Sequence, residues 1–462
     1  MFFAFAIVGR TGSAYVTGHQ KIIGRHKLTF WFSMTLFSLA NPINSSKRKW
    51  KEGIFLPSQL NLFMYTLGII REGKTPPDKR VPFSPSQCVA LQNQFNVRVL
   101  VQPSPIRCFT DDEYRAAGIE LSEDLSSCDV LFGVKEVRNE DLIPGKTYFF
   151  FSHTIKEQPH NKKLMKALVE KKIRMVDYEC LTDQQHNRII GFGHYAGIVG
   201  TYNGIRGYGL RYRLFDLKPA WLCHDRRELK LELEKVNLPN IKIVITGNGR
   251  VANGAIELLG LMGMRRITPF EFTHFSFREP TYVQLHSNNY NEPIDGAAWN
   301  TERFYQQPEA FRSTFLKYTK HCDLLVHCSY WNPKAPVLFS KKDMRSSEFR
   351  ISVIADVTCD IDGSVPSTHR ASTIAEPFYG YNPTTEQEGQ PFATDTITVM
   401  AVDNLPCELP RDASEDFGKD LLDKVIPFVI GEDAEGIIER GTIVQNGALM
   451  PNFSYLKGYA GL

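Results

Sequence analysis

The run from Tyr148 to Gln158 places two ionisable side chains directly after an apolar segment. It reads Tyr-Phe-Phe-Phe-Ser-His-Thr-Ile-Lys-Glu-Gln, so that His153 and Lys156 follow a predicted buried strand. Open α/β sheets bind ligands outside the carboxyl ends of their strands, and histidine is the most frequent general acid or base. The pattern therefore predicts acid–base chemistry at the end of this strand.

A second apolar run, Val130-Leu-Phe-Gly-Val, carries Lys135 and Glu136 on its end. Two such strands side by side would form a cationic cleft that transfers protons. Any one of Lys135, His153 and Lys156 alone is better explained as a solvated strand end. Three of them in the same register favour a functional site.

A glycine turn further along the chain predicts a cofactor site. The stretch 241–259 reads as a β-branched strand, a turn with Gly247 and Gly249, and a helix in which Ala252 replaces the third glycine of the dinucleotide fingerprint. Glycines allow the backbone to approach a pyrophosphate, which the first helical amides bind. A purely structural turn is the alternative. We assign cofactor binding to Gly247, Gly249, Arg250 and Val251.

A carboxylate downstream of the glycine turn bears on the choice of cofactor. The segment Arg266-Ile-Thr-Pro-Phe is read as the second strand, and it ends at Glu271, about 20 residues after the turn, where an acid binds the ribose hydroxyls. A carboxylate at this place repels a 2′-phosphate, so Glu271 predicts NAD. Arg265 and Arg266 lie close by in sequence and keep NADP open.

These motifs resemble the lysine-forming saccharopine dehydrogenases, and most of all the lysine-ketoglutarate reductase half of bifunctional aminoadipic semialdehyde synthase. The resemblance runs from about Met64 to near the C-terminus. Its blocks are Arg71-Glu-Gly-Lys-Thr-Pro-Pro-Asp-Lys-Arg80, Gly133-Val-Lys-Glu136, Phe150 to Gln158, Asp177-Tyr-Glu179, Gly191 to Gly197, Asp356 to Asp360 and Val402-Asp-Asn-Leu-Pro. Alanine dehydrogenase and the transhydrogenase α chain share the first block and the lysine and histidine strands.

The resemblance implies a reaction that joins lysine to 2-oxoglutarate through an imine and reduces it to saccharopine. Lys135 and His153 are then the acid–base pair, which Glu136 and Glu179 tune by their charge. The expected carboxylate anchors are Arg80, Lys156 and Arg188. Asp403 matches an acidic position near the domain hinge and is expected to contact the lysine end. Ordinary ion pairing is the alternative role for Glu179 and Asp403.

Two other functions remain open. An alanine dehydrogenase would use the same lysine and histidine with Arg80 as its one carboxylate anchor. A cofactor-sensing protein would keep the nucleotide fold without catalysis, although the presence of both Lys135 and His153 disfavours it. The expected partners are lysine, 2-oxoglutarate and saccharopine, without nucleic acid or membrane, in a monomer or small homo-oligomer.

Composition is typical of a soluble enzyme. The 462 residues are 42% hydrophobic and 23% charged, and a net charge of +3 is too small to indicate nucleic-acid binding. The nine cysteines are dispersed and lack a C-x-x-C pair, which disfavours a zinc site and a disulfide framework. We therefore expect no metal and a reducing compartment, the cytoplasm.

Residues 1–63 differ from the rest of the chain, with eight Lys or Arg and one acid. The apolar run 28–40 ends in Ser-Leu-Ala and imitates a signal-peptide core, but it is shorter than the roughly 20 residues of a membrane helix. A basic, acid-poor start also suits a mitochondrial transit peptide. We favour the interpretation that this extension is not part of the fold and that the protein starts at Met64.

The pattern as a whole predicts an α/β protein with two Rossmann-like, doubly wound domains and an active-site cleft between them. The substrate domain spans 64–191 and is completed by 411–462, and the dinucleotide domain spans 192–410. Apolar spacing predicts a helix between Asn161 and Lys172, and a second from Tyr202 to Leu217. The aromatic-rich segment 272–320 resembles an insert of the reductase half and receives no role.

Overall fold

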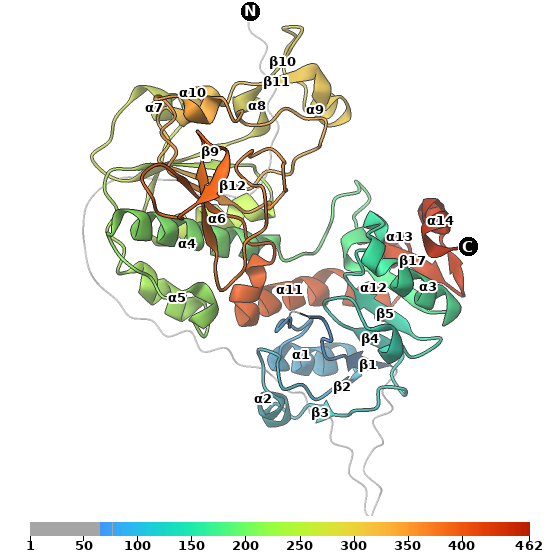
Figure 1. The fold of residues 1–462 in the computed structure, drawn as a ribbon. Helices are drawn as coiled ribbons and strands as arrows, with labels where there is room; N and C mark the ends of the chain where they lie inside the picture. Colours follow the sequence, from blue (N-terminus) through green and yellow to red (C-terminus); the bar gives the residue numbers. More distant parts are fainter. Residues whose placement is uncertain (1–64, 76) are drawn as a thin grey trace, which may run out of the picture. The chain divides into compact units, whose positions relative to one another are not determined.

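A computed structural model of the chain describes residues 65–75 and 77–462. The interpretations of residues 1–63 and of a start at Met64 therefore lie outside the described residues. Figure 1 shows the described part as a ribbon coloured along the sequence.

The first sheet has eight strands in the order β18-β17-β6-β5-β4-β1-β2-β3, of which β1 to β6 and β18 run in one direction and β17 runs opposite to them. Its strands are β1 (Thr66–Ile69), β2 (Arg98–Val101), β3 (Glu120–Leu121), β4 (Val130–Phe132), β5 (Thr147–Phe150), β6 (Arg174–Asp177), β17 (Thr442–Gln445) and β18 (Ala448–Leu449). Every residue of β4 is buried, as expected for a parallel strand covered on both faces.

Seven α-helices accompany this sheet along the chain. They are α1 (Pro85–Phe95), α2 (Asp111–Ala116), α3 (Lys162–Glu170), α11 (Pro410–Lys424), α12 (Ile426–Ile430), α13 (Ile437–Gly441) and α14 (Lys457–Ala460). The predicted helix between Asn161 and Lys172 is confirmed as α3, which buries Leu164, Met165, Leu168 and Val169. The C-terminal segment, red in Figure 1, returns to this sheet because β17 pairs with β6 and α14 packs on α3.

The second sheet has the order β15-β14-β16-β13-β12-β7-β9-β8, in which β14 alone runs opposite to the other strands. Its strands are β7 (Lys242–Thr246), β8 (Arg265–Arg266), β9 (Thr281–Leu285), β12 (Leu324–His327), β13 (Val353–Asp356), β14 (Phe378–Asn382), β15 (Gln387–Gly389) and β16 (Ile397–Met400). The chain leaves β7 toward one edge and later continues toward the other, as in doubly wound folds. The predicted α/β class with two such sheets is confirmed.

The remaining elements follow the second sheet or connect the two. Their helices are α4 (Gly193–Tyr212), α5 (Arg226–Leu233), α6 (Arg250–Leu261), α7 (Pro269–His274), α8 (Ser287–Tyr290), α9 (Thr301–Gln306) and α10 (Leu316–Thr319), and β10 (Asn291–Pro293) pairs with β11 (Phe311–Ser313). Short 3-10 helices lie at η1 (Asn139–Asp141), η2 (Thr154–Lys156), η3 (Pro159–Asn161), η4 (Tyr178–Cys180), η5 (Ala220–Leu222), η6 (Pro308–Ala310), η7 (Asp343–Arg345), η8 (Leu405–Glu408) and η9 (Pro451–Leu456).

Helix α4 corrects the expectation of a helix from Tyr202 to Leu217. It begins nine residues earlier, at Gly193, and its glycines lie inside the helix. A Cβ on Gly197 would lie 1.8 Å from the carbonyl oxygen of Val251, and one on Gly254 would lie 2.0 Å from that of His194. The glycines therefore let α4 and α6 pack backbone against backbone, which outweighs the low helix propensity of glycine.

Among the helices of residues 65–75 and 77–462, none is long and apolar enough to cross a membrane. In the same residues, no group of three or more His, Cys, Asp or Glu side chains is arranged to hold a metal ion.

Candidate active site

The parallel pair β4 and β5 positions the two predicted acid–base residues. Leu131 pairs with Tyr148 and Phe132 with Phe149, so the carboxyl ends of the two strands lie side by side at one end of the sheet. Lys135 follows the end of β4 by three residues, and His153 follows the end of β5 by three. The equal spacing brings both side chains to one end of the sheet.

A buried carboxylate, which sequence reasoning missed, fixes the backbone beyond β4. Glu72 accepts hydrogen bonds from the backbone amides of Val134 at 2.7 Å and of Lys135 at 2.9 Å. Burial, followed by repulsion from Asp78, raises the pKa of Glu72 to about 8. The signal for it was present in the first motif block, where Glu72 follows the end of β1 as Lys135 follows β4.

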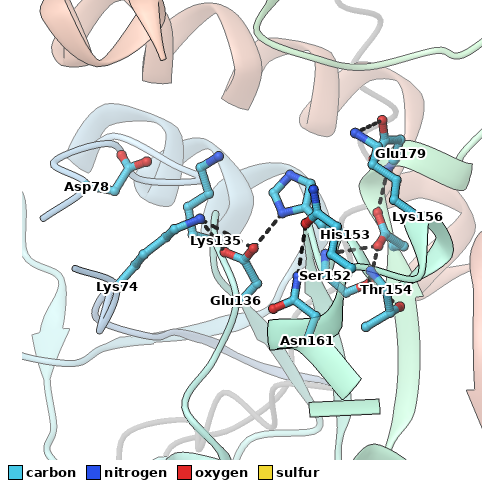
Figure 2. A network of polar contacts seen from close by, with 12 residues as sticks. Lys74, Asp78, Lys135, Glu136, Ser152, His153, Thr154, Lys156, Asn161 and Glu179 are labelled. Carbon is cyan, nitrogen blue, oxygen red and sulfur yellow. Dashed lines mark hydrogen bonds and ion pairs between the residues drawn. The ribbon is translucent and has the colours of Figure 1, made fainter. Parts of the chain in front are cut away.

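His153 is held by a carboxylate on the neighbouring strand end. Its Nδ1 lies 2.6 Å from Oε1 of Glu136, and the Nζ of Lys74 lies 3.0 Å from Oε2 of the same carboxylate (Figure 2). Although burial opposes ionisation, the hydrogen bond with His153 and the nearby positive charges lower the pKa of Glu136 to about 2. An ionised Glu136 therefore orients the imidazole and leaves Nε2 for a substrate.

The backbone at His153 takes a left-handed conformation, with φ 51° and ψ 13°. This region is uncommon for residues other than glycine, although histidine adopts it more often than most. Such conformations persist where the surrounding structure enforces them. Here, neighbouring Ser152 donates from its backbone amide to the buried carboxylate of Asp177 at 2.9 Å, which fixes the chain before the turn.

The amine of Lys135 is kept away from ion pairs. Within residues 65–75 and 77–462, no hydrogen bond or salt bridge reaches its Nζ, and in Figure 2 the side chain extends without a marked contact. Burial, followed by the positive charges of Arg80 and Lys74, lowers the pKa of Lys135. A lowered pKa favours the neutral amine, which is the form that accepts a proton.

A cavity of about 200 Å³ contains six of the eight predicted catalytic and substrate residues. These six are Arg80, Lys135, His153, Glu179, Arg188 and Asp403; the wall is completed by Phe151, Phe192, Gly193, Ala196, Asn404 and Pro406. The other two predicted residues lie behind the wall, since Glu136 contacts His153 and Lys156 contacts Glu179. The cavity therefore brings several cations together with the two residues that the sequence predicts to be the acid–base pair.

One side of the Arg80 guanidinium is bound by the carboxylate of Asp78. Its Nε and Nη2 lie 3.0 and 2.6 Å from the two carboxylate oxygens of Asp78, and its guanidinium stacks 4.2 Å from the ring centre of Phe192. The charge of Arg80 and its hydrogen bonds overcome the effect of burial and hold the pKa of Asp78 below its usual range. Nη1 and the second N–H of Nη2 remain for a carboxylate, and the partner Asp78 was missed although it stands two residues earlier.

Glu179 bridges the two other predicted anchors. Its Oε1 lies 3.1 Å from Nζ of Lys156 and 3.6 Å from Nη1 of Arg188, so it makes the ion pairs that were the alternative reading. Its second oxygen, Oε2, is buried and has no hydrogen-bond partner among the described residues. Asp403 lines the cavity and makes no ion pair within the same residues. Oε2 of Glu179 can therefore accept a hydrogen bond from one more donor.

The glycine turn fits the expectation for a dinucleotide. Gly247 has φ 95°, where a side chain would be strained, and its amide donates to the carbonyl of Leu285 at 2.8 Å. Gly249 directly precedes α6, and a Cβ added there would meet nothing within 4 Å, so the helix start is open to a pyrophosphate. Arg250 donates through Nη2 to the backbone carbonyl of Arg188 at 3.0 Å, which joins the turn to the substrate cavity.

The placement of Glu271 at the end of the strand beside the glycine turn is wrong. The chain first forms the two-residue edge strand β8 and then returns to place β9 next to β7. Glu271 lies in the first turn of α7, where its carboxylate accepts from the amide and hydroxyl of Thr268 in a capping box. This side chain stabilises a helix start.

The chain is similar to known enzymes over most of its described length. Residues 68–199 match the family described as alanine dehydrogenase/PNT, N-terminal domain. The α-aminoadipic semialdehyde synthase of Arabidopsis thaliana is 27% identical over 84% of this chain and 41% of its own length. The mitochondrial enzyme of that name from Rattus norvegicus is 26% identical over 85% of the chain and 47% of its own length. The chain thus spans less than half of these relatives.

A single-function enzyme is also similar. The NAD+, L-lysine-forming saccharopine dehydrogenase of Emericella nidulans is 23% identical over 79% of this chain and 92% of its own length. The resemblance to saccharopine dehydrogenases and to the semialdehyde synthases, noted from the motifs, is confirmed by these relatives.

Two solved structures show the same fold. An L-alanine dehydrogenase matches with a TM-score of 0.58 and 17% identity, over 85% of this chain and 98% of its own. The transhydrogenase from Sinorhizobium meliloti matches with a TM-score of 0.53 and 14% identity, over 84% and 100%.

Proposed function

We propose that this chain is an oxidoreductase that interconverts saccharopine with L-lysine and 2-oxoglutarate, using a nicotinamide cofactor. The observation that carries the proposal is the pairing of Lys135 and His153 in one cation-lined cavity at the ends of adjacent strands. Relatives named saccharopine dehydrogenase and semialdehyde synthase support the same reaction.

The chain's own residues account for the proton transfers. Neutral Lys135 accepts a proton from the ε-ammonium group of lysine, which frees the amine to attack the ketone carbon of 2-oxoglutarate. His153, with Glu136 balancing its positive charge, then donates a proton from Nε2 to the hydroxyl group that leaves as water, and an imine forms. The bound reduced cofactor supplies the hydride that reduces the imine.

The charges of the cavity suit a substrate with several carboxylates. Arg188, which is 41% exposed, and the free edge of Arg80 offer two guanidinium groups to the cavity, and Lys156 adds a cation behind the wall through its contact with Glu179. The unpartnered Oε2 of Glu179 is placed to accept a hydrogen bond from an amine. An alanine dehydrogenase needs one carboxylate anchor, so the additional cations favour the larger substrate.

The neighbourhood of the glycine turn favours NADP(H). Residues 284–289, which form the end of β9 and the start of the connection after it, contain no acid that would repel a 2′-phosphate. Instead, Nη2 of Arg266 lies 2.6 Å from Oε1 of Gln284, whose Nε2 donates to the carbonyl of Gly247 at 2.8 Å. A guanidinium is therefore linked to the turn at the side of the adenosine ribose. We therefore propose NADP(H) as the preferred cofactor, in place of the NAD that the sequence alone predicted.

One assay tests the proposal. Cofactor oxidation is followed with lysine plus 2-oxoglutarate and, in parallel, with pyruvate plus ammonia, each with NADH and NADPH. We expect lysine-dependent turnover and saccharopine as the product. Turnover of pyruvate and ammonia alone would instead make the chain an alanine dehydrogenase, and cofactor binding without either reaction would make it a cofactor sensor.

The compartment is tested separately. The cytoplasmic prediction competes with a mitochondrial one, which rests on the basic residues 1–63 and on the mitochondrial name of the rat relative. A fluorescent protein fused after residue 63 distinguishes the two, because mitochondrial import of the fusion would identify a transit peptide.

A further inference from the structure

The loops that follow β1 and β2 form a second cavity with residues near η5 and the start of α11. Its volume is about 570 Å³, compared with about 200 Å³ for the substrate cavity. Pro77 and Lys79 line it from the first loop, Ile106 and Cys108 from the second, Trp221 from η5 and Arg411 from α11. The two cavities share no lining residue, so the second cavity is a separate space.

The wall between the two cavities consists of η8 and the segment that carries Arg80. Asn404 and Pro406 line the substrate cavity, whereas the next residue, Cys407, lines the second cavity. In the same way, Arg80 lines the substrate cavity and its neighbour Lys79 the second one. A ligand in the second cavity can therefore bind without displacing a substrate.

Three cysteines that are far apart in the sequence line the second cavity. They are Cys108, Cys223 and Cys407. Burial raises the pKa of these thiols to about 12, 11 and 12, respectively. Thiols with such pKa values stay protonated, and a protonated thiol packs as a small apolar group rather than binding a metal or reacting with an oxidant. The cysteines therefore form an apolar wall together with Ile106 and Ile374.

The charged side chains that line the second cavity are all basic. They are Lys79, Arg107, His224 and Arg411, and no Asp or Glu of residues 65–75 and 77–462 lines it. Acids outside the lining pair with three of these four. Nη2 of Arg107 binds Asp111, Nδ1 of His224 lies 3.4 Å from Oδ2 of Asp225, and Nη2 of Arg411 lies 2.7 Å from Oε1 of Glu113. These three pairs add little net charge to the cavity.

Lys79 is the lining cation that has no such partner. Its carbonyl accepts the amide of Cys108 at 2.8 Å, which ties its backbone to the second loop. Its side chain is exposed, and within the described part of the chain no hydrogen bond or ion pair reaches its Nζ. The cavity therefore offers a single uncompensated positive charge, which suits a ligand with one carboxylate or sulfonate group.

Trp221 adds an aromatic surface to the same cavity. It is 42% exposed, although tryptophan is highly buried on average in folded proteins. An inorganic anion at Lys79 would leave this aromatic surface uncovered, and an uncharged ligand would leave the ammonium group without a counter-charge. An apolar wall with one convergent charge is typical of a site for a small organic molecule.

We propose that the second cavity binds a small organic monoanion with an apolar body the size of one or two rings. Its anionic group pairs with Lys79, and its body packs on Trp221 and on the apolar wall. This ligand class follows from the cavity alone and does not depend on the proposed reaction.

The test uses 1-naphthoate as the monoanion and 1-naphthamide as its uncharged analogue. Dissociation constants are measured by calorimetry for the full chain, both alone and with saturating NADPH and 2-oxoglutarate, which compete for the glycine turn and the substrate cavity. We expect the wild-type protein to bind 1-naphthoate more tightly than 1-naphthamide, with the same Kd in the presence and absence of NADPH and 2-oxoglutarate.

Two substitutions separate the contribution of the charge from that of the aromatic surface. Lys79→Gln should raise Kd for 1-naphthoate about 2- to 5-fold, the usual worth of an exposed ion pair, and leave Kd for 1-naphthamide unchanged. Trp221→Ala should raise Kd for both probes roughly 2- to 10-fold, the worth of an aromatic contact, whereas Trp221→Phe should retain binding. Lys419→Gln and Tyr455→Ala are the matched controls, because both residues are exposed and lie outside the lining.

Absence of 1-naphthoate binding in the wild-type protein would overturn the proposal. An unchanged Kd for 1-naphthoate in Lys79→Gln, or an equal loss for both probes in that variant, would also overturn it. Binding that disappears when NADPH and 2-oxoglutarate are added would assign the probe to the cofactor or substrate site instead. None of these results depends on turnover, so the proposed reaction can fail while the second cavity keeps its ligand.

Discussion

Nδ1 of His153 lies 2.6 Å from Oε1 of Glu136, and this contact links the ends of the two strands that carry the proposed acid–base residues. Glu136 directly follows Lys135, so the carboxylate that orients the histidine is one residue from the lysine. The other oxygen of Glu136 binds Lys74, which in turn lowers the pKa of Lys135. Glu136 and Lys74 thus connect the residue that orients the histidine with the charge that lowers the pKa of Lys135.

Substitution of either reactive residue should slow catalysis without affecting cofactor binding. General acid–base groups each contribute roughly 10²–10⁴-fold, so His153→Gln and Lys135→Met should each lower kcat by that factor. Each should also remove one limb of the pH–rate profile. Near-normal kcat with an unchanged profile in both variants would move the search for the pair to His194, Glu179 and Asp403.

Lys74→Met should shift the acidic limb of kcat/KM. The charge of Lys74 lowers the pKa of Lys135, and its removal makes the protonated amine easier to form. Because Lys135 is active as the neutral base, activity is lost as the pH falls through its pKa, and this loss should begin at a higher pH in the variant. Lys79→Met, a nearby exposed lysine, is the control, and a shift to lower pH would contradict the assignment.

Arg80→Ala should lower the stability of the fold, whereas Arg188→Ala should weaken the binding of 2-oxoglutarate. Loss of Arg80, which is 3% exposed, leaves the carboxylate of Asp78 buried and unpaired, a change that costs about 3–5 kcal/mol. A marked fall in thermal midpoint is therefore expected. Arg188→Ala should keep the midpoint and raise KM for 2-oxoglutarate. Equal midpoints for the two variants would show that the Arg80–Asp78 pair does not support the fold.

The same pair predicts a pH dependence of stability. The folded pKa of Asp78 lies below its ordinary value of 3.8, so the unfolded chain binds more protons in the acid range. The stabilisation is present above about pH 4 and is lost as the pH falls through the folded pKa. Chemical denaturation from pH 6 to pH 2 should show a smaller acid loss for Asp78→Asn, which starts from a lower stability.

Local patterns predicted that Lys135 and His153 lie together, because the carboxyl ends of neighbouring parallel strands lie at the same end of a sheet. Because β4 and β5 are adjacent and parallel, the equal number of residues after each apolar run places Lys135 beside His153. The glycines of α4 were misread because helix propensity is local, whereas their reason is contact with α6. Asp78 was missed because its importance comes from burial against Arg80, which no sequence spacing reveals.

The misplacement of Glu271 has the same origin, because the order of strands in a sheet is not local information. Distance along the chain suggested that the next strand after the glycine turn lies beside β7, but the chain visits the edge strand β8 first. Glu271→Ser should therefore leave the ratio of KM for NADH and NADPH unchanged. Its expected effect is a small loss of stability, because the backbone amide of Thr268 loses its capping-box acceptor.

Arg266→Ala is the variant that should alter cofactor choice. Removal of the guanidinium beside Gln284 takes away the cation next to the adenosine ribose, so KM for NADPH should rise while KM for NADH stays near wild type. Arg265→Ala is the matched control, since Arg265 pairs with Glu279 at 3.4 Å. Wild-type KM lower for NADH than for NADPH, together with a shift in Glu271→Ser, would restore the ribose role of the glutamate and exclude Arg266 as the residue that reads the 2′-phosphate.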